Sequence, residues 1–174
     1  MGTSGIEIQL VDSPSGSLSP LAGLIDGYRT HFGSPSDPDG VLAWLQERIG
    51  TTGLTAYLAW APPRCSRARP EAVGMAVVVR SPGALSFSDY WNVRDLFVAA
   101  EHRRRGVARA LLDEIIRRAT TARVPRLAVQ TDEDNAAALS LYRDFGFQPV
   151  TGVQQLLLDL PASAREGARI RVIR

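Results

Sequence analysis

The sequence has few of the residues that form disulfides or hold metal ions. Its 174 residues include one cysteine and two histidines. Cys65 therefore has no partner for an intramolecular disulfide, and its polar surroundings, PPRCSRARPE, favour a loop thiol over a catalytic one. His31 and His102 belong to no Cys/His cluster with the spacing of zinc ligands. We therefore predict no metal site.

Long apolar runs are also missing. The sequence contains no stretch of about 18 or more apolar residues, the length needed to span a bilayer. Its polar start, MGTSGIEIQL, lacks the features of a signal peptide. We expect a cytoplasmic protein with no membrane partner.

Lysine is missing altogether, because all 20 basic side chains are arginine. Arginine pairs bidentately with phosphate, which would suit a nucleic-acid-binding protein. The 18 acidic residues nevertheless leave a formal net charge of only +2, and no long basic run is interleaved with aromatic residues. A coding bias toward arginine explains the missing lysine at least as well. We therefore expect no nucleic-acid partner.

Length and apolar content predict a single domain. A chain with 45% hydrophobic residues can bury a core, but 174 residues are too few for two full domains. We assign residues 1–160 to this domain and residues 161–174 to a C-terminal tail. The order of expected elements predicts an α/β fold in which a mixed sheet is flanked by helices. The expected strands are 6–11, 55–61, 73–80, 91–98, 126–131 and 153–160, and the expected helices are 18–31, 41–49, 107–120 and one from residue 135.

The stretch DLFVAAEHRRRGVA, residues 95–108, has the features of an anion-binding loop. An apolar strand runs into a turn that carries Arg103, Arg104, Arg105 and Gly106, and an amphipathic helix follows. The amides of residues 103–108 can converge there, and the helix N-terminus adds its unpaired N–H groups and positive dipole end. Gly106 permits close backbone approach and a positive φ. The alternative is an ordinary strand–loop–helix joint with surface arginines.

A second block, NAAALSLYRDFGF, covers residues 135–147. Ala138, Leu141, Tyr142 and Phe145 fall on one helical face, and Gly146 suits a C-terminal stop. Together the two blocks resemble the GCN5-related N-acetyltransferase (GNAT) superfamily. The family's pyrophosphate loop, R-x-x-G-x-(G/A), is matched by Arg103, Gly106 and Ala108, and its second block by Asn135, Ala138, Leu141, Tyr142, Gly146 and Phe147.

The resemblance is close from about residue 92 to residue 147 and looser over the flanks. It implies acetyl-CoA as the cofactor and a cleft between two parallel strands, 91–98 and 126–131, that splay apart at one end. It also implies a backbone donor for the acetyl carbonyl near Phe97 or Val98. The cofactor contacts that it implies are Phe97, Val98, Arg103, Arg104, Arg105, Gly106, Val107, Ala108, Asn135 and Tyr142.

The implied reaction is direct transfer of an acetyl group to an amine, which needs a base for the amine and an acid for the leaving thiolate. Tyr142 is the family's usual acid, although the same pattern suits a core tyrosine. Acetyltransferases of small polyamines commonly carry a carboxylate just before the Asp-Leu pair, where this chain has Arg94. Asp95 can act as the base, bind a cationic substrate or pair with Arg94. Strand alternation places Arg94 and Asp95 on opposite faces.

Aromatic residues near the expected acceptor end suit a small amine. We expect substrate contacts from Tyr28, Phe32, Trp91 and Asp95, with His31 and Tyr90 nearby. The sequence does not name the amine, so a protein N-terminal or lysine acetyltransferase and a non-catalytic CoA-binding sensor remain alternatives. The alternating strand 153–160 and the segment 169–173 lie near the chain end, and we expect them to pair in a homodimer.

Overall fold

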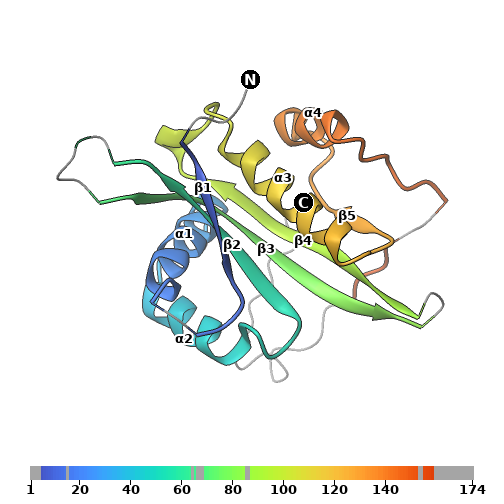
Figure 1. Ribbon diagram of the computed structural model, residues 1–174, viewed down its shortest axis with the longest axis horizontal. Coiled ribbons are helices and arrows are strands. Elements are labelled where there is room, and N and C mark those ends of the chain that lie inside the picture. Colours follow the sequence, from blue (N-terminus) through green and yellow to red (C-terminus); the bar gives the residue numbers. More distant parts are fainter. Residues whose placement is uncertain are drawn as a thin grey trace.

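The computed structural model describes residues 5–14, 16–63, 65, 69–84, 87–152 and 155–158 and confirms the predicted α/β fold. The described strands form one five-stranded sheet in sequence order, antiparallel from β1 to β4, whereas β5 pairs with β4 in parallel (Figure 1). The strands are β1 (Glu7–Val11), β2 (Leu54–Ala61), β3 (Glu71–Gly83), β4 (Ser88–Val98) and β5 (Leu127–Val129).

Helices cover both faces of the sheet. The helices α1 (Leu18–His31) and α2 (Pro38–Arg48) lie on one face, and α3 (Val107–Thr121) lies on the other (Figure 1). A short 3-10 helix, η1 (Ala100–His102), precedes α3, and α4 (Ala136–Asp144) follows β5. None of the helices among the described residues is long and apolar enough to cross a membrane.

Alternation along the strands divides the apolar side chains between two cores. In β2, Ala56 and Leu58 face the core beneath α1 and α2, whereas Tyr57 and Ala59 face the core beneath α3. The amphipathic helix expected at 107–120 is α3, which buries Val107, Leu111 and Ile115 against this core, and α4 packs against the same core through Tyr142. Burial of these two apolar surfaces is the main stabilising contribution to the fold.

A β-bulge interrupts the alternation in β4. Val77 of β3 pairs with Asp95 and Val78 pairs with Val93, so Arg94 is an extra residue without a partner on β3. Such a bulge shifts the phase of the strand beyond it. The sequence-based assignment of Arg94 and Asp95 to opposite faces assumed a regular strand and does not apply here.

The phase shift decides which side chains reach α1. Before the bulge, Trp91 and Val93 pack on the α3 side; after it, Leu96 packs there and Phe97 packs on the α1 side. In a regular strand Asp95 and Phe97 would share a face with Trp91 and Val93. The bulge instead turns Asp95 and Phe97 toward α1.

The predicted elements are found with boundaries shifted by a few residues, with one exception. The strand expected at 153–160 is not formed by residues 155–158, which are exposed and lie outside the sheet. Its mixture of apolar and polar residues gave a strand pattern, but no strand among the described residues pairs with residues 155–158. The rest of that segment and the tail 161–174 lie outside the described residues.

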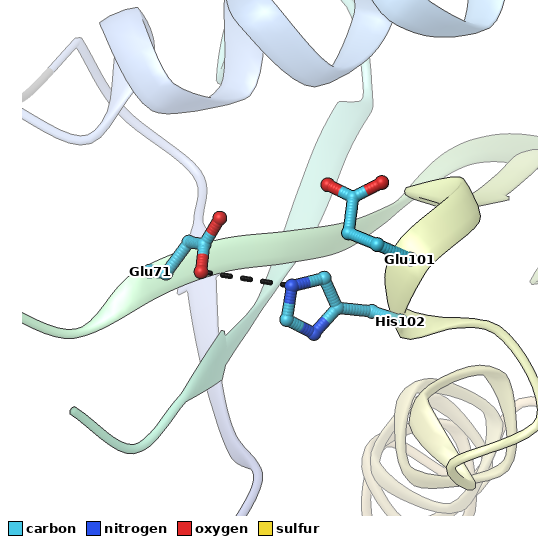
Figure 2. Close-up of side chains that lie close together, drawn as sticks. All are labelled: Glu71, Glu101 and His102. Atoms are coloured by element: carbon cyan, nitrogen blue, oxygen red, sulfur yellow. Dashed lines mark ion pairs between the residues drawn. The ribbon is translucent and has the colours of Figure 1, made fainter. Parts of the chain in front are cut away.

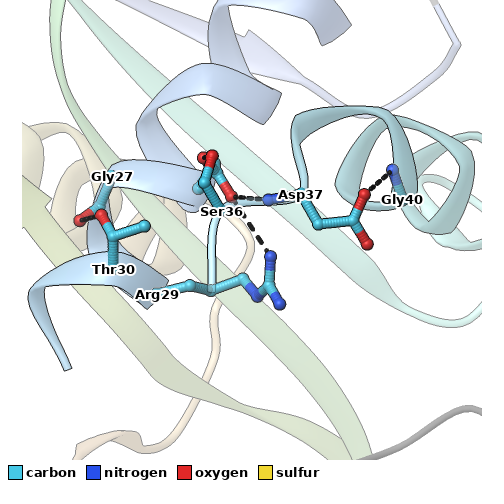
Figure 3. Close-up of polar contacts among 7 residues, drawn as sticks. Gly27, Arg29, Thr30, Ser36, Asp37 and Gly40 are labelled. Atoms are coloured by element: carbon cyan, nitrogen blue, oxygen red, sulfur yellow. Dashed lines mark hydrogen bonds and ion pairs between the residues drawn. The ribbon is translucent and has the colours of Figure 1, made fainter. Parts of the chain in front are cut away.

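Asp26 joins the end of α1 to the start of α2. Its Oδ2 accepts a 2.6 Å hydrogen bond from Ser36 Oγ, and its Oδ1 accepts one of 2.8 Å from the Asp37 amide and one of 3.2 Å from Arg29 Nη1. Figure 3 shows Arg29, Ser36 and Asp37 around this corner, with the Asp37 carboxylate capping α2 at Gly40. The Asp37 amide and then the Ser36 hydroxyl hold the pKa of Asp26 below its ordinary value of 3.8.

We predict that Asp26→Ala destabilises the protein by about 2 kcal/mol at neutral pH, because charge-assisted hydrogen bonds at a buried corner are lost. The lowered folded pKa means that this contribution is present above 3.8, the value for the free side chain, and disappears as the pH falls through the folded value. Urea unfolding at pH 7 and in acid measures the difference in unfolding free energy between wild type and Asp26→Ala. Glu47→Gln, an exposed change on α2, is the control. A difference in acid as large as that at pH 7 would contradict the role of the ionised Asp26 carboxylate.

Candidate active site

A cleft of about 530 Å³ lies beside the end of β4. The β4–β5 pairs end at Val93 and Val129, but β4 continues to Val98. The cleft is lined by residues of α1, the last residues of β4, the loop before α3, the first turn of α3, and α4. β4 and β5 therefore separate beyond Val93, as expected, and the cleft forms where they separate.

The loop before α3 presents an open helix N-terminus to the cleft. Gly106 is the N-cap with a left-handed φ of 81°, and no described side chain caps the helix there. By contrast, Asp37 caps α2 and Asn135 caps α4. The first N–H groups of α3 therefore remain available for an anion, as the sequence predicted for this turn. Gly106, Val107 and Ala108 line the cleft.

Gly74 of β3 sets the distance between this loop and the sheet. A Cβ at position 74 would lie 2.8 Å from Val107 Cγ1 and 3.1 Å from the Phe97 carbonyl oxygen. Only glycine lets the first residue of α3 pack so closely on the strand. We did not anticipate this contact, although an isolated glycine within an apolar strand is its usual sequence signal.

The arginines of the loop have different surroundings. Arg103 donates from Nε to the Val98 carbonyl at 3.1 Å, and its guanidinium lies 5.8 Å from the centroid of the Phe97 ring. Arg104 has a positive φ of 62° and also lines the cleft. Arg105 is exposed and does not line it. Two of the three predicted arginines are thus brought to the cleft.

A fourth arginine, which sequence reasoning missed, ties α3 to α4. Arg109 Nη2 lies 2.6 Å from Asp144 Oδ2, and its guanidinium lies 5.0 Å from the centroid of the Phe145 ring. Arg109 also lines the cleft. Its partner is 35 residues away in the sequence, so no local pattern pointed to this pair.

Asn135 and Tyr142 lie at the two ends of α4. The Asn135 side chain lines the cleft, and its Oδ1 accepts a 3.1 Å hydrogen bond from the Ala138 amide. Tyr142 is only 7% exposed, stacks edge-on with Phe147 at 5.8 Å, and is not among the cleft-lining residues. Burial raises the pKa of Tyr142, so its phenol stays protonated at neutral pH.

An aromatic cluster forms the other end of the cleft. Tyr28, His31 and Phe32 from the last turns of α1 meet Phe97 of β4, with ring centroids 5.0 to 6.3 Å apart. All four residues line the cleft. The sequence predicted Tyr28 and Phe32 here, and Phe97 joins them because of the bulge at Arg94.

Asp95 lies next to Tyr28. Burial raises the pKa of Asp95 above 3.8, and the hydrogen bond from the Tyr28 hydroxyl and the charge of Arg94 oppose that shift. Burial and then the charge of Asp95 raise the pKa of Tyr28 to about 12. Asp95 is not itself a lining residue, so it borders the cleft through Tyr28.

Trp91, expected among the substrate contacts, lies elsewhere. It precedes the bulge and therefore faces the α3 core, where it is 8% exposed and lines a separate hollow with Tyr57 and Arg118. Tyr90 is exposed near the opposite end of β4. The aromatic set inferred from the sequence is thus divided between two places.

The chain is similar to known proteins both in sequence and in fold. The model of the acetyltransferase (GNAT) family matches residues 44–147. The uncharacterized N-acetyltransferase YhfO of Bacillus subtilis (strain 168) is 26% identical over 142 residues, which cover 82% of this chain and 91% of that protein. A crystal structure of a probable acetyltransferase is 26% identical with a TM-score of 0.76, and the match covers 89% of this chain and 98% of that one.

A more distant structure shares the fold alone. It is an aminoglycoside acetyltransferase, meta-AAC0020, from an uncultured soil metagenomic sample, solved in complex with sisomicin. It is 18% identical with a TM-score of 0.73, and the match covers 90% of this chain and 97% of that one.

We predict that Gly106→Glu weakens CoA binding at least about tenfold, because a side chain at this positive φ distorts the loop and its charge repels phosphate. Calorimetric titration with CoA measures the effect. Gly152→Glu is the matched control, since Gly152 also has a positive φ, of 77°, but lies exposed with open space around it. Equal CoA affinity in both variants would remove the phosphate site from this loop.

Proposed function

Because the chain belongs to the GNAT acetyltransferase family and is an acetyl-CoA-dependent N-acetyltransferase, we propose that it acetylates a primary amine of a small molecule by direct attack. One observation carries this proposal: a single cleft runs from the open N-terminus of α3 to an aromatic cluster beside a buried carboxylate. The first end suits a phosphate-bearing cofactor, and the second suits a cationic amine.

The residues present fit acetyl-CoA. We assign the pyrophosphate to the amides of Gly106, Val107 and Ala108, with Arg103 and Arg104 beside them. The last residues of β4 have no β5 partner, which suits backbone pairing with an extended arm. Asn135 can contribute its amide NH₂, while its oxygen already accepts a hydrogen bond from the Ala138 amide in capping α4. Bound acetyl-CoA supplies an activated thioester.

Asp95 is our candidate for the base. The attacking amine must lose a proton, and a carboxylate that is partly desolvated holds a proton more strongly than an exposed one. Tyr28 contacts Asp95 and lines the cleft, so it orients the carboxylate and connects it with the acceptor end. The same pair also attracts a cationic amine before the proton is lost. The third possible role of Asp95 is to form an ion pair with Arg94 and take no part in the reaction.

Tyr142 is our candidate for the acid. A proton must reach the sulfur atom that leaves, and a buried phenol with a raised pKa holds that proton until it is needed. The Tyr142 side chain is on the α4 face that also carries Ala138 and Leu141, two cleft-lining residues. The acid role requires the Tyr142 hydroxyl to reach the cleft when the thioester is bound.

The acceptor end favours a compact amine over a protein segment. This end of the cleft is lined by Tyr28, His31 and Phe32 on the α1 side and by Phe97 on the β4 side. Aromatic faces and one carboxylate recognise a small cation by cation–π contact and charge. Polyamine-like compounds, amino-acid derivatives and aminoglycoside-like molecules all carry such amines.

A panel of amines tests the proposal directly. The purified protein is incubated with acetyl-CoA and small amines, and also with peptides that present an N-terminus or lysine, and mass spectrometry records acetylated product. Turnover of small amines supports the proposal. Turnover of peptides alone would assign the protein to the N-terminal or lysine class, and CoA binding without any product would indicate a sensor.

We predict that Asp95→Asn lowers the plateau of kcat/KM and removes the acidic limb of its pH profile. A base must be deprotonated, so wild-type activity falls as the pH drops through the raised pKa of Asp95. Asp89→Asn, an exposed change on the same strand, is the control. A rise in KM at constant kcat would make Asp95 a cation-binding residue, and two unchanged parameters would place the base elsewhere.

We predict that Tyr142→Phe lowers kcat on the order of 100-fold while CoA affinity barely changes. Phenylalanine preserves the packing against Phe147, so thermal unfolding should stay close to that of wild type. Tyr90→Phe, at an exposed position, is the matched control. Steady-state rates near wild type would reduce Tyr142 to a packing residue.

We also propose that the protein forms a homodimer. The proposal rests on exposed leucines and not on the edge strand expected at 153–160. Leu156, Leu157 and Leu158 are consecutive and 86%, 67% and 84% exposed, and such apolar patches are usually covered by a partner. Light scattering at roughly tens of micromolar should give twice the chain mass. A monomer at that concentration contradicts the proposal.

A further inference from the structure

A group of polar side chains lies at the start of β3 and in η1, beside the cleft that His102 helps to line. Glu71 begins that strand, while Glu101 and His102 belong to η1, just before the phosphate loop. One ligand-type atom from each side chain lies within 4.8 Å of the other two. Figure 2 shows Glu71 reaching toward the imidazole of His102, with Glu101 extending from the neighbouring turn.

His102 is the unusual member of this group. Its side chain is 5% exposed, and its buried Nε2 has no hydrogen-bond partner among the described residues. A buried, unpaired ring nitrogen costs free energy and calls for an explanation. The Glu71 Oε2 atom faces it at 3.6 Å, which is too long for a good hydrogen bond.

The same distance fits two ligands of one metal ion. Zinc holds nitrogen and carboxylate oxygen at about 2.0–2.2 Å in a tetrahedron, which places neighbouring ligand atoms roughly 3.4 Å apart. The 3.6 Å between Nε2 and Oε2 is close to that value. Both glutamates are exposed, so their side chains can adjust and the ion can enter from solvent.

We propose that Glu71, Glu101 and His102 bind a divalent transition-metal cation of the zinc class, with the remaining positions open to water. One imidazole and two carboxylates suit zinc better than a hard cation such as Mg²⁺, because imidazole favours borderline metals. The ion would fasten the start of β3 to η1. The sequence predicted no metal site, because its two histidines belong to no Cys/His cluster and Glu71 lies far from Glu101 and His102 in the sequence.

The experiment titrates Zn²⁺ into the full chain and measures binding by calorimetry. The Cys65→Ser background excludes the only thiol as a ligand. We expect saturable binding of one ion per chain, without competition from Mg²⁺. Glu71→Gln and Glu101→Gln should each weaken Zn²⁺ affinity by on the order of 10- to 100-fold, at least the effect of losing an outer-shell partner. Co²⁺ should give visible d–d absorption in wild type that both variants lose.

Two controls separate this site from other surface ligands. His31→Asn removes the other imidazole, and Glu133→Gln removes an exposed carboxylate in another part of the chain; both should bind Zn²⁺ like wild type. His102→Gln should abolish binding, but the glutamate variants decide the test if this buried substitution prevents folding. Wild type without saturable Zn²⁺ binding, or binding unchanged in both glutamate variants, overturns the proposal and leaves an ion pair between Glu71 and His102.

Discussion

The pairing of β4 with β5 stops early, and the position of the candidate active site depends on where it stops. β5 has three residues and β4 has eleven, so the far end of β4 pairs with β3 but has no described strand on the side of β5. Backbone groups in that position need other partners. The Arg103 side chain supplies one for the Val98 carbonyl, and the remaining space forms the cleft between α1, the loop and α4. A longer β5 would close the sheet and remove the cleft.

Local patterns predicted the elements because each of them follows from neighbours in the sequence. The helix expected at 18–31 has the bounds of α1, and the positive φ expected to favour glycine at position 106 is found there. The cleft-lining roles of Phe97 and Asn135 followed from family resemblance.

The features that sequence reasoning missed all depend on distant contacts. The bulge at Arg94 follows from register with β3, and it moved Asp95 and Phe97 to the α1 side while Trp91 stayed on the other. The pairing of Arg109 with Asp144 joins residues of different helices. Within the strand expected at 153–160, the described residues 155–158 form no strand for the opposite reason, because their local pattern has no partner strand among the described residues.

The contact between Gly74 and Val107 has a consequence for the thermodynamics of ligand binding. It clamps the first turn of α3 to the sheet, and the hydrogen bond from Arg103 to Val98 clamps the preceding loop to the end of β4. The loop is therefore ordered before any ligand arrives. Its conformational entropy is lost during folding instead of during association, so more of the interaction energy is expressed as affinity. Preorganisation of this kind lets a small loop bind a large, flexible and highly charged molecule.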